Sequence, residues 1–157
     1  MAVSAGMLNR VYNVSKAEHP LKAFDQLHYF KLFLFDTGLL KHMAGIDNSA
    51  VLLKSDYQFK GALTENYVLQ QLREQLDVEP RFYAGNRSEI DFILQNGTDI
   101  IPVEVKSGED KSAASFKSYI KTHQPITAIR FSKRGYVTNG GITNIPLYLA
   151  CKTKQLI

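Results

Sequence analysis

The feature of this 157-residue sequence that most constrains its fold is the dipeptide Asn96-Gly97, which lies between two runs of alternating apolar residues. Asn-Gly readily adopts the positive backbone dihedral angles of a two-residue hairpin loop, and it is the strongest short-range signal for a β-hairpin. With these two residues as the loop, Gln95 faces Thr98 and Asp91 faces Pro102. Residues 88–108 are therefore predicted to form two antiparallel strands.

Side chains alternate along a strand, so this hairpin has two different faces. The first face is apolar except for Asp99 near the loop, and it carries Ile90, Phe92, Leu94, Ile101, Val103 and Val105. The second face carries Asp91, Glu104 and Lys106. On the predicted register the Cα atoms of Asp91 and Glu104 are diagonal neighbours, about 7–8 Å apart. A slip of one residue would separate them onto opposite faces.

A helix is predicted over residues 59–77, where Val68, Leu69, Leu72 and Leu76 recur at helical spacing. Glu65 lies on the same apolar stripe, where a carboxylate is costly to bury without a partner. Two explanations are open. Glu65 lies in the first turns, where the helix dipole favours a carboxylate and the stripe reaches solvent, or it finds its partner at the hairpin.

The other patterns complete an α/β protein with a mixed sheet flanked by helices. A strand is predicted over residues 78–85 with Arg81 pointing outward, a helix over residues 109–125 and a strand over residues 127–135. The apolar run from Phe30 to Phe35, interrupted by Lys31, predicts a buried strand or the start of a helix, and Asp36 is expected to cap a turn or helix. We assign residues 1–50 to an N-terminal extension and residues 51–157 to the main domain.

Composition narrows the functional classes. The single cysteine, Cys151, suggests a reducing cytoplasm, and the histidines and cysteine show no zinc spacing. No apolar run is long enough for a transmembrane helix, so no membrane partner is expected. From Lys111 onward the sequence has basic residues but no Asp or Glu, which indicates a polyanionic partner or a solvated basic face. The residues expected to bind nucleic acid are Lys111, Lys117, Lys121, Arg130, Lys133 and Arg134.

The charged residues of the hairpin match the requirements of phosphodiester hydrolysis. That reaction needs an activated water and neutralisation of the charge that develops on phosphate, and a hard divalent ion bound by carboxylates supplies both. Asp91 and Glu104 provide two carboxylates, Lys106 provides an amine, and Glu65 adds a third carboxylate if its helix packs on this face. The alternative is an exposed cross-strand charge cluster, which contributes little to stability.

The order of these residues resembles the PD-(D/E)XK nuclease superfamily, in the segments "GALTENYV" with Glu65, "SEIDFIL" with Asp91 and "VEVKSG" with Glu104 and Lys106. The αβββαβ order of elements agrees with a restriction-endonuclease-like core. More narrowly, "KLFLFDTGLL", "GALTENYVLQQL", "EIDFIL", "IPVEVKSG" and "NIPLYLA" are similar to an uncharacterised C-terminal domain of many prokaryotic AAA-type P-loop ATPases.

This resemblance implies which residues would bind a metal ion and which domain or partner would accompany the chain. Glu65, Asp91, Glu104 and the carbonyl of Val105 would bind Mg²⁺ or Mn²⁺, and Lys106 would stabilise the attacking water or the phosphate. The sequence has no G-x-x-x-x-G-K-[ST] motif, so no bound nucleotide is expected. Residues 1–30 resemble the tail of a preceding winged-helix-like segment. We therefore expect a cytoplasmic C-terminal fragment of an AAA-type ATPase, with DNA and an ATPase domain or partner as its associates.

Three hypotheses for function follow from the sequence. The first is a Mg²⁺-dependent nuclease that hydrolyses DNA phosphodiesters. The second is a catalytically silent module of nuclease fold that binds nucleic acid or a partner and regulates an ATPase. The third is a scaffold for oligomerisation, and the oligomeric state stays open.

Overall fold

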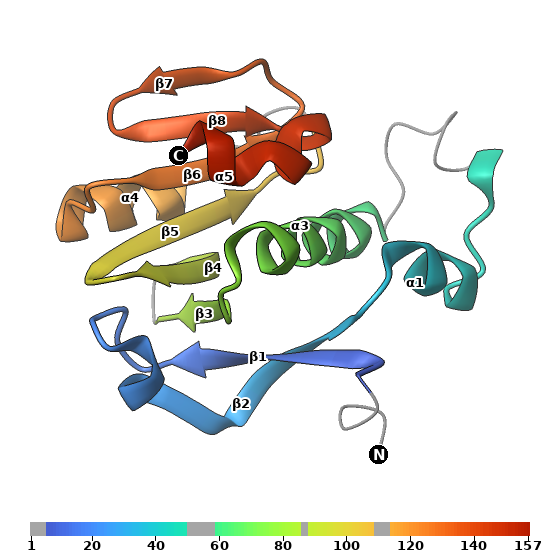
Figure 1. The fold of residues 1–157 in the computed structure, drawn as a ribbon, viewed down its shortest axis with the longest axis horizontal. Coiled ribbons are helices and arrows are strands. Elements are labelled where there is room, and N and C mark those ends of the chain that lie inside the picture. The colour runs from blue at the N-terminus through green and yellow to red at the C-terminus, as the bar shows by residue number, and fades with distance from the viewer. Residues whose placement is uncertain (1–5, 50–58, 86–87, 109–113) are drawn as a thin grey trace.

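The computed structural model describes residues 6–49, 59–85, 88–108 and 114–157. Within these residues the chain forms a mixed eight-stranded sheet flanked by helices, which confirms the predicted α/β class (Figure 1). The strand order is β2-β1-β3-β4-β5-β6-β8-β7. Neighbours are parallel in the pairs β1–β3, β5–β6 and β6–β8, and antiparallel in the others.

The bounds of the elements support the predicted order. The strands are β1 (Leu8–Val14), β2 (Asp25–Leu34), β3 (Arg81–Ala84), β4 (Glu89–Asn96), β5 (Asp99–Val105), β6 (Ala128–Ser132), β7 (Val137–Asn139) and β8 (Ile142–Pro146). The described helices are α1 (Thr37–Met43), α3 (Lys60–Leu76), α4 (Ala114–His123) and α5 (Thr153–Leu156), with the 3₁₀ helices η1 (Leu21–Phe24) and η2 (Leu147–Lys152). The succession α3-β3-β4-β5-α4-β6 is the αβββαβ order expected from the sequence.

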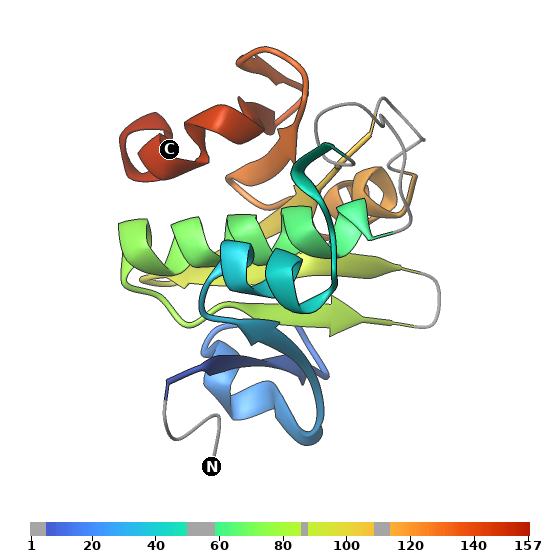
Figure 2. The same ribbon diagram turned by 90° about the vertical axis from the view of Figure 1, so that its right-hand side faces the viewer.

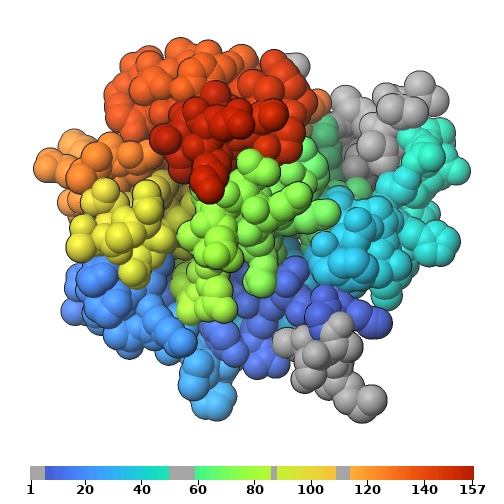
Figure 3. All heavy atoms as spheres, in the orientation of Figure 1, coloured from blue at the N-terminus to red at the C-terminus, as the bar shows by residue number. Residues whose placement is uncertain are grey.

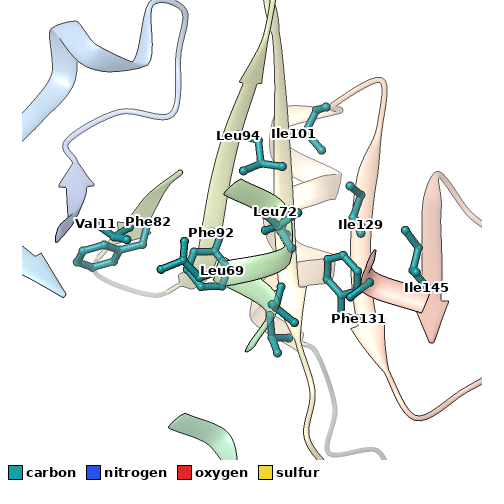
Figure 4. Close-up of a cluster of buried hydrophobic side chains, with 14 of the residues drawn as sticks. Val11, Leu69, Leu72, Phe82, Phe92, Leu94, Ile101, Ile129, Phe131 and Ile145 are labelled. Carbon is teal, nitrogen blue, oxygen red and sulfur yellow. The ribbon is translucent and has the colours of Figure 1, made fainter. Parts of the chain in front are cut away.

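Two apolar clusters hold the layers together. The larger one packs Val68, Leu69 and Leu72 of α3 against the sheet, where the side chains of Leu69 and Leu72 lie among Phe92, Leu94, Ile129 and Phe131 (Figure 4). The smaller cluster packs Phe116 and Tyr119 of α4 against Ile90, Ile93 and Ala128. The helical stripe that the sequence predicts in α3 is therefore the contact that fixes this helix, and with it Glu65, on the sheet.

Two other segments enclose α3. The C-terminal elements η2 and α5 contact α3 along one side, as the red and green surfaces show in Figure 3. On another side α1 lies next to α3 (Figure 2), and Gln70 accepts hydrogen bonds from the amide and the hydroxyl of Thr37. Asp36 caps α1 by accepting a hydrogen bond of 2.7 Å from the amide of Leu39, as expected.

The hairpin forms, but its register differs from the prediction by two residues. Asn96 pairs with Asp99 and Ile93 pairs with Pro102, so Gln95 faces Ile100 rather than Thr98. Pro102 pairs with Ile93, so Asp91 does not face Pro102 as predicted. If the same register continued past the last pair, Phe92 with Val103, Glu104 would lie opposite Asp91. A shift of two residues keeps the side chains of the paired residues on their faces. Asp91 lies beyond the last pair of the ladder, and its expected proximity to Glu104 is supported by the charge coupling between the two carboxyl groups.

A β-bulge in β4 corrects a second expectation. Ile93 and Ile90 pair with Arg81 and Tyr83, so β4 uses one more residue than β3 across the same interval. A bulge of this kind changes the face that the following side chains present. Ile90 consequently packs in the cluster of α4 rather than with Phe92 and Leu94, where the simple alternation had placed it.

The N-terminal strands belong to the same sheet and carry two further corrections. Arg81 was expected to point outward, yet its side chain is buried because β3 is an inner strand, and Arg81 donates two hydrogen bonds of 2.8 and 2.9 Å to Asp25. The run from Phe30 to Phe35 was expected to form a buried strand or to start a helix. Residues 30–34 do form a strand, but it is the edge strand β2, where most side chains are exposed and Phe33 is the buried residue of the run.

The pairing of β2 with β1 is interrupted by a wide bulge. Tyr12 pairs with Phe30, whereas the next residue, Asn13, pairs with Gln26. Residues 27–29 of β2 are therefore extra residues without partners in β1. This bulge divides the long edge strand into two shorter paired segments.

The Asp25–Arg81 ion pair should anchor the N-terminal strands. We expect Asp25→Ala to lower the free energy of unfolding by about 3 kcal/mol, because it leaves the Arg81 guanidinium buried without its carboxylate. Urea unfolding monitored by circular dichroism would measure this. Glu79→Ala is the matched control, because Glu79 also pairs with Arg81 but its side chain is 74% exposed. Equal losses in the two variants would contradict the anchoring role.

Candidate active site

The site begins where the ladder between β4 and β5 ends. The last paired residues are Phe92 and Val103, and beyond them the Asp91 carboxylate accepts a hydrogen bond of 2.7 Å from the backbone N–H of Val105. A side-chain oxygen thus satisfies an amide that would otherwise lack a strand partner. This bond fixes the Asp91 carboxylate against the end of β5.

Glu104 and Lys106 lie two residues apart on that same end of β5. The side chain of Glu104 is only 3% exposed, and its carboxylate forms an ion pair with the ammonium of Lys106, whose side chain is 35% exposed. The backbone N–H of Lys106 donates to the carbonyl of Phe131 in β6, which extends the parallel ladder past the site. The acid is therefore buried while the amine reaches toward solvent.

Glu65 reaches the same region from α3. Burial raises the pKa of the Glu65 carboxyl, Lys31 and Lys106 lower it, and the charges of Glu89 and Glu104 raise it further. These couplings place Glu65 among the charges of the hairpin. Glu65 is therefore desolvated and within electrostatic range of hairpin charges, although its strongest opposing charge, Lys31, comes from β2.

The strongest electrostatic perturbation is at Asp91. Its pKa rises from 3.8 to about 7, first because the carboxyl is desolvated and then because Glu104 is close, with a smaller contribution from Glu65. The hydrogen bond from Val105 and the charge of Lys106 only partly oppose this shift. Three acids from α3, β4 and β5 therefore share a neighbourhood in which their negative charges are incompletely compensated.

Two charged residues of this neighbourhood were missed by the sequence analysis. The ammonium of Lys31 on β2 lies 2.7 Å from a carboxylate oxygen of Glu89 on β4. Burial lowers the pKa of Lys31, but the hydrogen bond to Glu89 and the charges of Glu65 and Asp91 outweigh this and raise it. The sequence did contain a sign that Lys31 is a candidate site residue, because it interrupts an apolar run. Glu65 was singled out for the same reason, as a charged residue on an apolar stripe.

The acids are neighbours rather than a preformed set of metal ligands. Among the residues that the structure describes, no three His, Cys, Asp or Glu side chains lie close enough to hold one ion together. The Glu104 carboxylate contacts Lys106, and the Asp91 carboxylate contacts the Val105 amide. The carbonyl of Val105 stays a predicted ligand.

The basic residues expected to bind nucleic acid divide into two groups. Lys117 and Lys121 on α4, together with Lys133 and Arg134 after β6, are exposed, while Lys111 lies outside the described residues. Arg130 differs, because its guanidinium lies 6.0 Å from the ring of Phe116, and its Nε and Nη2 atoms are buried without a hydrogen-bond partner in the described part of the chain.

A comparison with protein families gives one match, to a family described as a domain of unknown function (DUF4143), over residues 60–154. This match covers more than half of the chain. The chain belongs to the DUF4143 family. Comparisons with curated proteins and with solved structures each gave no significant match.

The DUF4143 segment begins at α3 and contains Glu65, Asp91, Glu104 and Lys106. Lys31 precedes this segment in the sequence. Its ion pair with Glu89 therefore links the N-terminal strand β2 to the matched domain. None of the helices that the structure describes is both long and apolar enough to cross a membrane.

The raised pKa of Asp91 predicts a pH-dependent stability in this DUF4143 chain. Between about pH 4 and pH 7 the folded protein keeps a proton on Asp91 that the unfolded chain has released. The free energy of unfolding therefore falls as the pH rises through this window, by at most about 1.4 kcal/mol per pH unit from this group. Asp91→Asn removes the effect, while its amide oxygen can still accept from Val105.

We accordingly expect Asp91→Asn to be more stable than the wild type above pH 7, with the difference shrinking as the pH falls toward 4. Urea unfolding with EDTA over this range would measure it. Asp99→Asn, at the exposed hairpin loop, is the matched control. Curves for the wild type and Asp91→Asn that run parallel across the window would contradict the prediction.

Proposed function

We propose that this chain is a Mg²⁺-dependent nuclease of the PD-(D/E)XK type that hydrolyses DNA phosphodiesters. The observation that carries the proposal is the juxtaposition of Asp91, Glu104 and Lys106 at the ends of β4 and β5, with Glu65 of α3 electrostatically coupled to Glu104 and Lys106. The sequence order of these residues and the αβββαβ succession agree with that superfamily.

The residues fit a hard divalent cation. Their side chains are carboxylates, the ligand type that Mg²⁺ and Mn²⁺ prefer. The pKa of Asp91 is raised first by desolvation and then by the neighbouring Glu104 carboxyl, and a bound dication would favour the ionised form against both effects. Asp91 and Glu104 would hold the ion, with Glu65 and the Val105 carbonyl as further ligands. When bound, the ion supplies Lewis-acid activation of water and charge neutralisation at the phosphate.

The protein's own groups would then have separate tasks. The Val105 amide keeps the Asp91 carboxylate in place, so this ligand needs little reorganisation. Glu104 in turn holds the Lys106 ammonium beside the acids. Because Lys106 is partly exposed, it can contact a phosphate oxygen or the attacking water and stabilise the charge that develops there.

The nucleic acid would be bound through its phosphates. Lys117, Lys121, Lys133 and Arg134 are exposed on elements that follow the site in the chain. Contacts between such residues and phosphates release counterions, so affinity should fall steeply with salt. Nothing in the sequence resembles a base-reading helix, so we expect the substrate to be recognised through its phosphate backbone.

A second candidate function is a catalytically silent module that binds nucleic acid or a partner and regulates an ATPase. DUF4143 domains are often found with AAA-type ATPases. The observation that favours this candidate is that the described acids are not arranged as three ligands around one point. The two candidates differ in metal binding and in cleavage, which can be measured separately.

The nuclease proposal predicts metal-dependent cleavage that depends on the hairpin residues. We expect wild-type protein to cleave plasmid or linear DNA in the presence of Mg²⁺ or Mn²⁺. The double variant with Glu104→Ala and Lys106→Ala should cleave at least about 100-fold more slowly, because it lacks both a metal ligand and the ammonium that stabilises charge on the phosphate or the attacking water. Gel electrophoresis of the products would measure this. Glu74→Gln, on the exposed side of α3, should cleave as the wild type does. Activity that persists in the double variant would come from a contaminant.

Metal binding separates the two candidates. Titration calorimetry should show Mn²⁺ binding to the wild type and a loss of about 10-fold or more in affinity in Asp91→Asn, which removes one charged ligand. Glu74→Gln again serves as the control. A wild type that binds DNA but takes up no Mn²⁺ would overturn the nuclease proposal and favour the silent module.

A further inference from the structure

The Lys31–Glu89 ion pair lies at the rim of the candidate active site rather than inside it. The side chain of Lys31 is 30% exposed and that of Glu89 is 58% exposed, whereas that of Glu104 is 3% exposed. Glu89 precedes Asp91 by two residues on β4, and Lys31 is electrostatically coupled to both Glu65 and Asp91. The pair is therefore more exposed than Glu104 and is electrostatically coupled to the buried acids.

The ammonium of Lys31 is held in place by its contacts, but not all of its N–H donors are used among the described residues. It lies 4.9 Å from the centre of the Phe82 ring, and Phe82 is held by the edge of Tyr29 at 5.4 Å. Among the described residues its one hydrogen bond goes to Glu89, although an ammonium has three donors. A group placed at this rim could thus accept from Lys31 without displacing any buried interaction.

We propose that Lys31 is a phosphate-binding residue of this site and that Glu89 occupies it in competition with the substrate. The ligand is a backbone phosphate that flanks the scissile bond of a polynucleotide. This inference rests on the proposed function. In the free protein Glu89 neutralises Lys31, and on binding a phosphate oxygen takes the place of the Glu89 carboxylate, which turns into solvent.

Energetics favour such an exchange. A partly exposed ion pair contributes between about 0.2 and 1 kcal/mol, so releasing Glu89 costs little. Once Glu89 is released, the state with a phosphate bound to Lys31 is more favourable than the state in which Lys31 has no anion. The reason is that the ammonium is partly desolvated where it lies over the ring of Phe82. The N-terminal strand β2 thereby supplies a contact to the substrate that the αβββαβ core lacks.

The proposal predicts opposite effects for the two members of the pair. Lys31→Ala should weaken binding of duplex DNA by about 5-fold or more and reduce the slope of log affinity against log salt by about 0.9, the value for one lost phosphate contact. Glu89→Gln should instead strengthen binding, by about 2- to 5-fold, because the competitor is removed. A merely structural ion pair would give changes of the same sign in both variants.

The experiment is fluorescence anisotropy of a labelled DNA duplex titrated with full-length protein at several salt concentrations, with Ca²⁺ in place of Mg²⁺ and with the duplex checked for integrity on a gel. Lys22→Ala is the matched control for Lys31. It removes an exposed lysine in η1, which lies near the hairpin loop because Leu21 bonds to Gln95, far along β4 from Glu89. Glu74→Gln is the matched control for Glu89. Lys31→Gln, which keeps most of the stem on Phe82, replaces Lys31→Ala if the alanine variant fails to fold.

The results of this experiment either support or overturn the proposal that Lys31 binds phosphate in competition with Glu89. Weaker binding in the Lys31 variant together with tighter binding in Glu89→Gln supports the proposal. Binding in the Lys31 variant that equals that of Lys22→Ala, or weaker binding in Glu89→Gln, overturns it, while wild-type binding and cleavage would leave the proposed nuclease function standing. A wild type that neither binds nor cleaves DNA overturns both.

Discussion

The hydrogen bond from the Val105 amide to the Asp91 carboxylate is the interaction on which the site depends. It lies at the point where β4 and β5 cease to pair, so it completes the sheet and orients an acid at the same time. The consequence is electrostatic. Holding Asp91 next to Glu104 in a desolvated position leaves two like charges together, and the pKa of Asp91 rises to about 7. A protein gains nothing in stability from such an arrangement, so its presence favours a functional reading of the hairpin.

Buried polar contacts fix the N-terminal strands to this core. Asn13 accepts from the amide of Ala84 at 2.8 Å, Asn66 of α3 accepts from the amide of Leu34 at 2.9 Å, and Arg81 holds Asp25. Two of these contacts join β1 and β2 to β3, and the third joins β2 to α3. Hydrogen bonds to buried groups are directional, so they set the position of β2 more closely than apolar packing alone would. The location of Lys31 next to Glu89 follows from that positioning.

Periodicity in the sequence was enough to predict the order of elements from α3 onward and the stripe that faces the sheet. The hairpin was found, but its register was two residues off, because the loop is Gly97-Thr98 rather than the predicted Asn96-Gly97. Asn96 is the last residue of β4 and pairs with Asp99. Side-chain alternation has a period of two, so this error did not move the paired side chains to opposite faces, and Asp91 is still electrostatically coupled to Glu104. Features that depend on distant parts of the chain were beyond sequence reasoning. The bulge beside Asp91 depends on pairing with β3, and the burial of Arg81 depends on strands on both sides of it. The ion pair of Lys31 with Glu89 depends on the place of β2 in the sheet, from which the Lys31 side chain reaches β4.

The free edge of the sheet has its own consequence. Leu27, Tyr29, Phe30 and Leu32 are exposed on β2, which has no neighbouring strand on its outer side among the described residues. A long regular edge with such side chains would offer a template for another extended chain to add by backbone hydrogen bonding. The extra residues between Phe30 and Gln26 interrupt that template, since they twist the strand and leave no continuous row of donors and acceptors. The irregular pairing of β2 with β1 is therefore a feature of the kind that keeps an exposed edge strand from pairing with another chain, and it acts alongside the charge of Lys31 in the same strand.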